Sequence, residues 1–90
     1  MWKLAPALAA GCTLVIKPAQ ETPLAAWEIV DLAQQVGFPA GTINLVNGDG
    51  PTVGAALAAH PGIDMISFTG STRAGILVDK AAADTVKKVA

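Results

Sequence analysis

The stretch Ile66-Ser67-Phe68-Thr69-Gly70-Ser71-Thr72 joins an apolar run, residues 63–68, to a helical pattern. The run is typical of a short buried strand. A helix that follows a tight glycine turn has first N–H groups without intrahelical partners, beside the positive end of its dipole. Gly70 permits a close approach by a ligand or a positive φ angle, and Ser71 can cap the helix or bond a phosphate oxygen. The turn predicts an anion site, and the alternative is a capped turn that binds nothing.

A chain of 90 residues suits one small domain. Such a short chain buries only about 60–65% of the surface that its unfolded form exposes. The composition is 52% hydrophobic and 14% charged, whereas an ordinary soluble domain is about 25% charged. Too little polar surface is therefore available to cover a small globule. The composition predicts a piece of a larger protein, or a piece that must associate.

Charge and cysteine usage exclude several classes of function. The net charge is −1 and the basic residues are scattered, so we expect no nucleic-acid partner. Cys12 is the single cysteine, and no Cys/His cluster has metal-binding spacing, so we expect no metal site. The apolar stretch before Cys12 imitates a secretory signal, but Pro6 interrupts it and it is far shorter than the ~20 residues of a membrane span. We expect no membrane segment and a cytoplasmic location.

Apolar runs alternate with helical patterns along the chain. The continuous, β-branched runs are typical of parallel strands that are covered on both faces. Gly11 and Gly37 are expected to end helices, and Pro23 stands at a first helical position behind a Thr22 cap. The predicted helices cover residues 2–10, 23–36, 51–60 and 71–83, and the predicted strands cover residues 12–16, 42–46 and 63–68, with a fourth beginning in 86–90.

This order predicts an α/β fold: a parallel sheet with helices on both faces, Rossmann-like and incomplete. Ligands of such sheets bind outside the carboxyl ends of the strands. Lys17, Asn47-Gly48 and Thr69-Gly70-Ser71 each follow a predicted strand. Three segments of ligand-binding type would therefore share one edge of the sheet.

Four segments together resemble the NAD(P)-dependent aldehyde dehydrogenase superfamily, at the middle of its coenzyme-binding domain. The spacing between them also agrees, and the resemblance covers essentially the whole chain. It implies that residues 1–90 form part of an NAD(P)-binding domain, with the catalytic and oligomerisation domains absent. The segments are WKLAPAL (2–8), VIKPA with TP (15–23), GFPAG through NLV to GPT (37–52) and FTGST (68–72).

The resemblance also implies roles for single residues. Lys17 would hold the adenosine ribose hydroxyls, and Gly50 and Pro51 would lie beside the adenine. Ser71, with Gly70 in the same turn, would contact the pyrophosphate. The residues present thus imply a site for NAD or NADP, and no catalytic residue.

Two positions depart from the family pattern. The family often has a glutamate three residues after the lysine, where this chain has Gln20 followed by Glu21. A carboxylate there would accept hydrogen bonds from the ribose and repel a 2′-phosphate. We expect Gln20 to face the ribose. Because Gln20 lacks that charge, we expect the site to bind NAD with unusual tolerance for NADP. Ala74 stands where a larger aliphatic residue often packs on the adenine, so looser stacking is expected.

The family's reaction requires groups that the resemblance places outside this chain. A cysteine thiolate attacks the aldehyde, hydride passes to the nicotinamide, and a glutamate activates water. Cys12 opens a predicted buried strand with no His or other base beside it in sequence, so we expect it to be an inert apolar residue.

Six further side chains have plain structural interpretations. His60, before Pro61, is expected to cap a helix end, and Asp49 to form a turn. Trp2 and Trp27 are expected to pack, and Lys87 and Lys88 to be solvated.

The leading hypothesis is a part of an enzyme that oxidises an aldehyde to a carboxylic acid with NAD or NADP. The resemblance implies that the complete enzyme is a homo-oligomer that binds the aldehyde, while the 90-residue piece alone is inactive. Two alternatives remain: a non-catalytic nucleotide-binding or interaction module with the same fold, and an inert truncated product.

Overall fold

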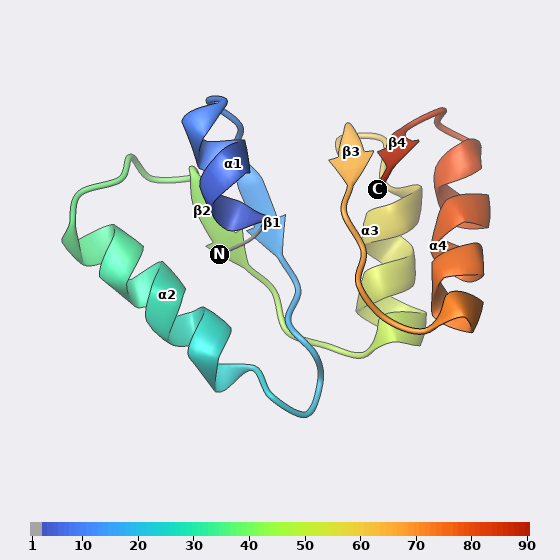
Figure 1. Ribbon diagram of the computed structural model, residues 1–90, viewed down its shortest axis with the longest axis horizontal. Helices are drawn as coiled ribbons and strands as arrows, with labels where there is room; N and C mark the ends of the chain where they lie inside the picture. The colour runs from blue at the N-terminus through green and yellow to red at the C-terminus, as the bar shows by residue number, and fades with distance from the viewer. Residues whose placement is uncertain (1–2) are drawn as a thin grey trace. The chain divides into compact units, whose positions relative to one another are not determined.

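The computed structural model describes residues 3–90, and the chain divides into two compact units, Met1–Asn47 and Gly48–Ala90 (Figure 1). Each unit holds one pair of parallel strands with helices packed beside it. The predicted α/β class and the parallel pairing are confirmed, with the strands in two pairs, β1–β2 and β3–β4. The start of the first predicted helix and the packing role of Trp2 lie outside the described residues.

The first unit consists of α1 (Leu4–Ala9), β1 (Leu14–Ile16), α2 (Leu24–Gln35) and β2 (Ile43–Leu45). Leu14 pairs with Ile43 and Ile16 with Leu45, so these four side chains share the half-buried face of the strand pair. Val15 and Asn44 point to the other face and are exposed. The Asn44 amide donates to the carbonyl oxygens of Leu14, at 3.0 Å, and Gly41, at 2.9 Å. This side chain therefore joins both strands to the turn before β2.

Glycine ends both helices of the first unit, as predicted. Gly11 and Gly37 have φ angles of +84° and +93°, which glycine adopts without steric cost. Their N–H groups donate to the carbonyls of Leu8 and Gln34, at 3.0 and 3.2 Å. The predicted Thr22 cap is wrong, because Pro23 occupies the N-cap position of α2 without a side-chain hydrogen bond.

The second unit consists of η1 (Gly50–Gly54), α3 (Ala55–Ala59), β3 (Met65–Ile66), α4 (Thr72–Ala83) and β4 (Lys88–Val89). The backbone of Phe68 continues the strand pairing, because its N–H donates to the Ala90 carbonyl at 2.8 Å. Helices α3 and α4 pack together. Ala58 on α3 and Ala82 on α4 are 1% and 0% exposed, and they are the fully buried apolar residues within 3–90.

Lys87 is buried, so the prediction that it is solvated is wrong. Only 9% of the residue is exposed, and its ammonium donates to the Thr85 hydroxyl. Val86, at φ +53°, turns the chain sharply between α4 and β4 and is itself 90% exposed. This turn carries Lys87 inward, whereas Lys88 is exposed as predicted.

Many large apolar side chains remain at the surface of both units. Trp27, which was expected to pack, is 55% exposed, and Leu24 and Val36 are 74% and 75% exposed. Ile76 and Leu77 on α4 are also at least half exposed. Within residues 3–90 no helix has the length and apolarity of a membrane span. Exposed apolar side chains in such number are typical of a surface that associates.

We expect the purified 90-residue chain to self-associate as its concentration rises, because association removes this apolar surface from water. Light scattering coupled to size-exclusion chromatography measures the mass. A Leu24→Glu, Trp27→Gln variant should associate less, and an exposed polar change, Gln34→Glu, serves as the control. A sharp monomer at every concentration would contradict the expectation.

Candidate functional site

The turn that enters α4 has the capped geometry that its sequence predicts. Ser71 is the N-cap residue, with an extended backbone at φ −70° and ψ 155°. Its hydroxyl oxygen accepts a hydrogen bond from the Ala74 N–H at 3.2 Å. Gly70, Ser71 and Thr72 are all exposed, so a ligand can reach the start of the helix. The remaining N–H groups of the first turn and the helix dipole favour an anion there.

Gly70 is required for a reason that the sequence did not reveal. Its φ is not positive, so the predicted alternative of a left-handed backbone is wrong. A Cβ at this position would lie 2.6 Å from Cζ of Phe68. The glycine therefore makes room for an aromatic ring of the same chain. The sequence held one signal of this contact, a phenylalanine two residues before a glycine.

A second capped helical segment begins at Gly50. Oδ1 of Asp49 accepts a hydrogen bond from the Thr52 N–H at 2.7 Å, and Pro51 stands in the first turn of η1. The Asp49 carbonyl also accepts from the N–H groups of Val53 and Gly54, at 3.0 and 3.1 Å. Asp49 is therefore a helix cap as well as the predicted turn former. An aspartate directly before a Gly-Pro helix start is the signal that could have identified this cap.

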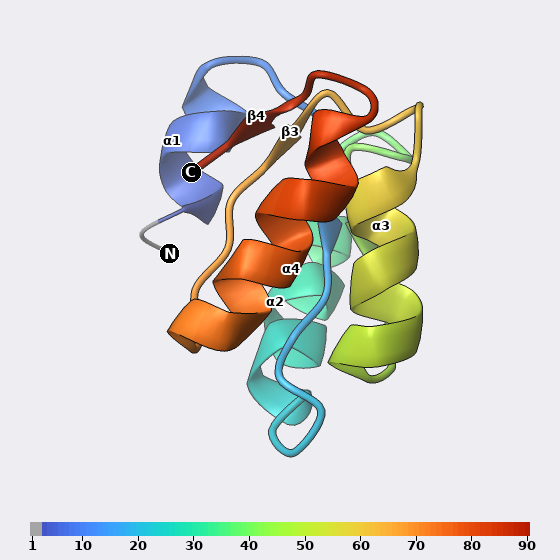
Figure 2. The ribbon, with the colours of Figure 1, turned by 90° about the vertical axis from the view of Figure 1, so that its right-hand side faces the viewer.

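Both capped starts lie at one end of the second unit. Figures 1 and 2 show that η1–α3 and α4 run in the same direction from that end, and that the chain leaving β3 descends to it. The structure thus brings together four of the six residues predicted to bind a coenzyme: Gly50, Pro51, Gly70 and Ser71. The positive ends of the helical dipoles add at the same edge.

Lys17 and Gln20 belong to the first unit. Lys17 follows β1 directly, is half-buried, and donates from Nζ to the Pro18 carbonyl at 2.9 Å. Gln20 and Glu21 are exposed in the turn that the Thr22 N–H closes on the Ala19 carbonyl, at 3.1 Å. The amide and the carboxylate therefore belong to adjacent residues of an accessible turn, three and four residues after the lysine.

Cys12 is exposed, so the prediction that it is a buried apolar residue is wrong. The reason is that β1 begins at Leu14, two residues later than predicted. His60 is the C-cap residue of α3, as predicted, and its Nδ1 accepts a hydrogen bond from the Gly62 N–H at 2.9 Å. Within the described part of the chain no group of His, Cys, Asp and Glu side chains could hold a metal ion.

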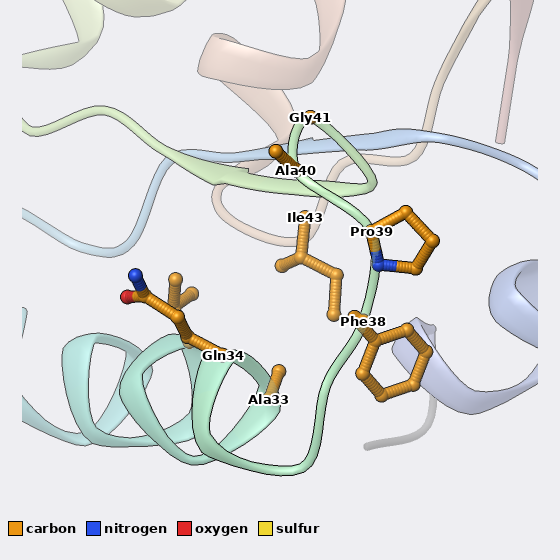
Figure 3. Close-up of a pocket in the computed structure, with 8 residues that line it drawn as sticks. Ala33, Gln34, Phe38, Pro39, Ala40, Gly41 and Ile43 are labelled. Atoms are coloured by element: carbon orange, nitrogen blue, oxygen red, sulfur yellow. The ribbon is translucent and has the colours of Figure 1, made fainter.

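The first unit also carries two shallow hollows beside α2, of about 370 and 470 Å³. Figure 3 shows the smaller one, where Ile43 and Phe38 face Ala33 and Gln34 of α2. The lining of both hollows contains no titratable side chain and none of the six predicted residues. Such a surface suits packing by apolar groups better than the orientation of a polar ligand.

Comparison with known proteins gives a consistent result over the whole chain. The model of the aldehyde dehydrogenase family matches residues 1–90. The chain is 62% identical over 88 residues to 3-succinoylsemialdehyde-pyridine dehydrogenase of a Pseudomonas species, covering 98% of this chain and 18% of that protein. It is 58% identical over 81 residues to retinaldehyde dehydrogenase 3 of Rattus norvegicus, covering 90% of this chain and 16% of that protein. The chain thus spans less than a fifth of the length of these relatives.

Solved structures agree with the sequence relatives. Aldehyde dehydrogenase C of Pseudomonas syringae, a mutant crystallised with NAD+ and octanal, is 61% identical with a TM-score of 0.94, over 97% of this chain and 18% of that one. Betaine aldehyde dehydrogenase of Staphylococcus aureus, in complex with NAD+, is 46% identical with a TM-score of 0.95, over 98% of this chain and 18% of that one. On this evidence the chain belongs to the aldehyde dehydrogenase family.

Proposed function

We propose that this chain is the part of an NAD(P)-dependent aldehyde dehydrogenase that binds the adenosine and pyrophosphate portions of the coenzyme. The observation that carries the proposal is the exposed, capped start of α4, where Ser71 and the first N–H groups form an anion site. The second capped start, at Gly50 and Pro51, lies at the same end of its unit. These features suit a ligand with negative charge and an attached flat ring.

The relatives support the chemistry of the whole enzyme. Those named above are dehydrogenases of aldehydes, and two of the solved ones hold NAD+. The bound coenzyme would accept hydride from the aldehyde carbon. This chain's own residues would bind and orient the coenzyme, while the parts of the enzyme beyond these 90 residues supply the nucleophile, the base, the aldehyde site and the homo-oligomer contacts.

Lys17 and Gln20 are assigned to the adenosine ribose. The half-buried Lys17 ammonium, held at the Pro18 carbonyl, is placed directly after β1, at the strand end where ligands of parallel sheets bind. Gln20 offers an amide oxygen to a ribose hydroxyl but no charge to repel a 2′-phosphate. The proposed coenzyme is therefore NAD, with NADP tolerated.

Replacement of Ser71 by aspartate separates coenzyme binding from helix capping. Aspartate caps a helix as well as serine does and suits the helix dipole, so α4 should keep its stability. A carboxylate beside the pyrophosphate should weaken NAD binding at least about tenfold, because like charges brought together cost several kcal/mol. Calorimetric titration gives the dissociation constant, thermal unfolding gives the stability, and Ser71→Thr is the control that keeps both roles. Unchanged NAD binding in Ser71→Asp would show that Ser71 only caps the helix.

Coenzyme preference tests the ribose assignment. The experiment uses a chimaera in which residues 1–90 replace the matching segment of the Pseudomonas 3-succinoylsemialdehyde-pyridine dehydrogenase, since the two are 62% identical. Gln20→Glu should raise the ratio of kcat/KM for NAD to that for NADP by about 5–30-fold, equivalent to about 1–2 kcal/mol of restored repulsion and hydrogen bonding. Gln34→Glu adds the same charge elsewhere and should leave the ratio unchanged. An equal ratio before and after Gln20→Glu would mean that Gln20 does not face the ribose.

The 90-residue chain alone should not oxidise aldehydes, because its exposed Cys12 has no base beside it in sequence to generate a thiolate. The assay follows NADH absorbance with aliphatic and aromatic aldehydes, and the chimaera is the positive control. Turnover that survives purification and disappears in Cys12→Ala would overturn the expectation and make Cys12 a nucleophile.

A further inference from the structure

The ring of Phe68 lies beside two glycines around the start of α4 and fills the space that a side chain would need at the first of them, Gly70. A Cβ built on Gly70 would lie 2.6 Å from Cζ of the ring, with the two Cε atoms at 3.2 and 3.3 Å. A Cβ built on Gly75 would lie 3.6 Å from Cε1 and 3.7 Å from Cδ1. The same ring thus contacts the turn and the helix that follows it.

The backbone of Phe68 is held by a hydrogen bond beyond the end of the β3–β4 pair. Its N–H donates to the Ala90 carbonyl at 2.8 Å, as an extension of the β3–β4 pairing. The residue is half-buried, whereas the turn residues Gly70 and Ser71 are exposed. Phe68 therefore joins the end of the strand pair to an exposed turn.

Neither glycine is explained by its backbone conformation. Gly70 and Gly75 are not among the glycines with positive φ. Gly75 lies inside α4, where its N–H donates to the Ser71 carbonyl at 2.9 Å, and glycine in a helix is less stable than alanine. The ring accounts for the glycine at position 70, where a Cβ would overlap it. The nearby ring is also consistent with a small residue at Gly75.

We propose that Phe68 is a positioning residue: its ring sets the direction of the Thr69–Ser71 turn and thereby places the Ser71 hydroxyl and the first N–H groups of α4. The absence of a side chain at Gly70 serves this ring and not the approach of a ligand. The consequence for coenzyme affinity rests on the function proposed above. The consequence for the geometry of the turn is independent of that function.

The proposal predicts a steric match between residues 68 and 70. Gly70→Ala adds a methyl group that overlaps the far edge of the ring, so the ring or the turn must shift, and a ring that fixes the turn shifts it. Phe68→Leu removes the Cε and Cζ atoms, which are the ones that the methyl group would meet. The double variant Phe68→Leu, Gly70→Ala should therefore lose this overlap and behave like Phe68→Leu alone, which keeps only the smaller defect caused by the missing ring. Gly75→Ala is the matched control, because its contact with the ring is an ordinary van der Waals distance.

Two measurements on the 90-residue chain report on the turn without any ligand. Hydrogen exchange of the Ala74 amide, followed by mass spectrometry at low protein concentration, reports the Ser71 cap, and thermal unfolding reports the unit. We expect Gly70→Ala to speed this exchange at least about tenfold, the change that follows from a loss of about 1.4 kcal/mol of local stability. The double variant should exchange within about twofold of Phe68→Leu alone, a non-additivity typical of residues in contact. Gly75→Ala should exchange no faster than the unchanged chain.

Kinetics in the chimaera report on the coenzyme. Gly70→Ala should raise KM for NAD with little change in kcat, and the double variant should return KM to the value of Phe68→Leu alone, because the turn binds but does not react. A role limited to overall folding would not change KM while leaving kcat unchanged.

The outcomes separate the two proposals. If the double variant exchanges and unfolds as badly as Gly70→Ala, or if Gly70→Ala has no effect, the role of Phe68 is overturned. If exchange and unfolding recover while KM for NAD stays high, Gly70 is needed for the ligand, and the claim that the glycine serves the ring fails. If exchange recovers while neither the chain nor the chimaera binds NAD, the role of Phe68 stands and the coenzyme function fails.

Discussion

The unpaired N–H groups at the start of α4 are the constraint on which the functional interpretation depends. A helix start must satisfy these donors by a cap, by water or by a ligand. Ser71 satisfies one of them, through the 3.2 Å bond from the Ala74 N–H. The rest face an exposed turn at the positive end of a helix of 12 residues. Any anion that this unit binds gains most there, and the anionic part of a nicotinamide coenzyme is its pyrophosphate.

The turn before α4 is constrained by the packing of Phe68 against Gly70 and not by a left-handed backbone at Gly70. The strands are only two or three residues long, and within residues 3–90 the fully buried apolar side chains are two alanines. Such small cores cannot hold an exposed turn by general compaction. The contact of one aromatic ring with Gly70 therefore matters more here than it would in a larger core. Large apolar side chains on α2 and α4 are exposed, and the chain spans less than a fifth of its relatives' length.

Three side chains show how burial departs from expectation, each for a different reason. Cys12 is exposed because β1 starts at Leu14, and Trp27 is exposed because α2 covers the strands with its other face. Lys87 is buried because the left-handed Val86 turns the chain inward before β4. The Cys12 thiol is therefore accessible in this chain, although no base lies beside it in sequence.

The sequence by itself determined the features that depend on a few neighbouring residues. Gly11 and Gly37 end their helices, Ser71 begins α4, and strands alternate with helices in the predicted order, because capping, left-handed glycine and apolar periodicity act locally. The family resemblance likewise followed from short motifs and their spacing. Only the tertiary structure decided why Gly70 is a glycine, which face of each helix is covered, and that the starts of η1 and α4 share one end of their unit. These features depend on contacts between residues that lie far apart in the chain or whose side chains meet only after folding, and no local pattern encodes them.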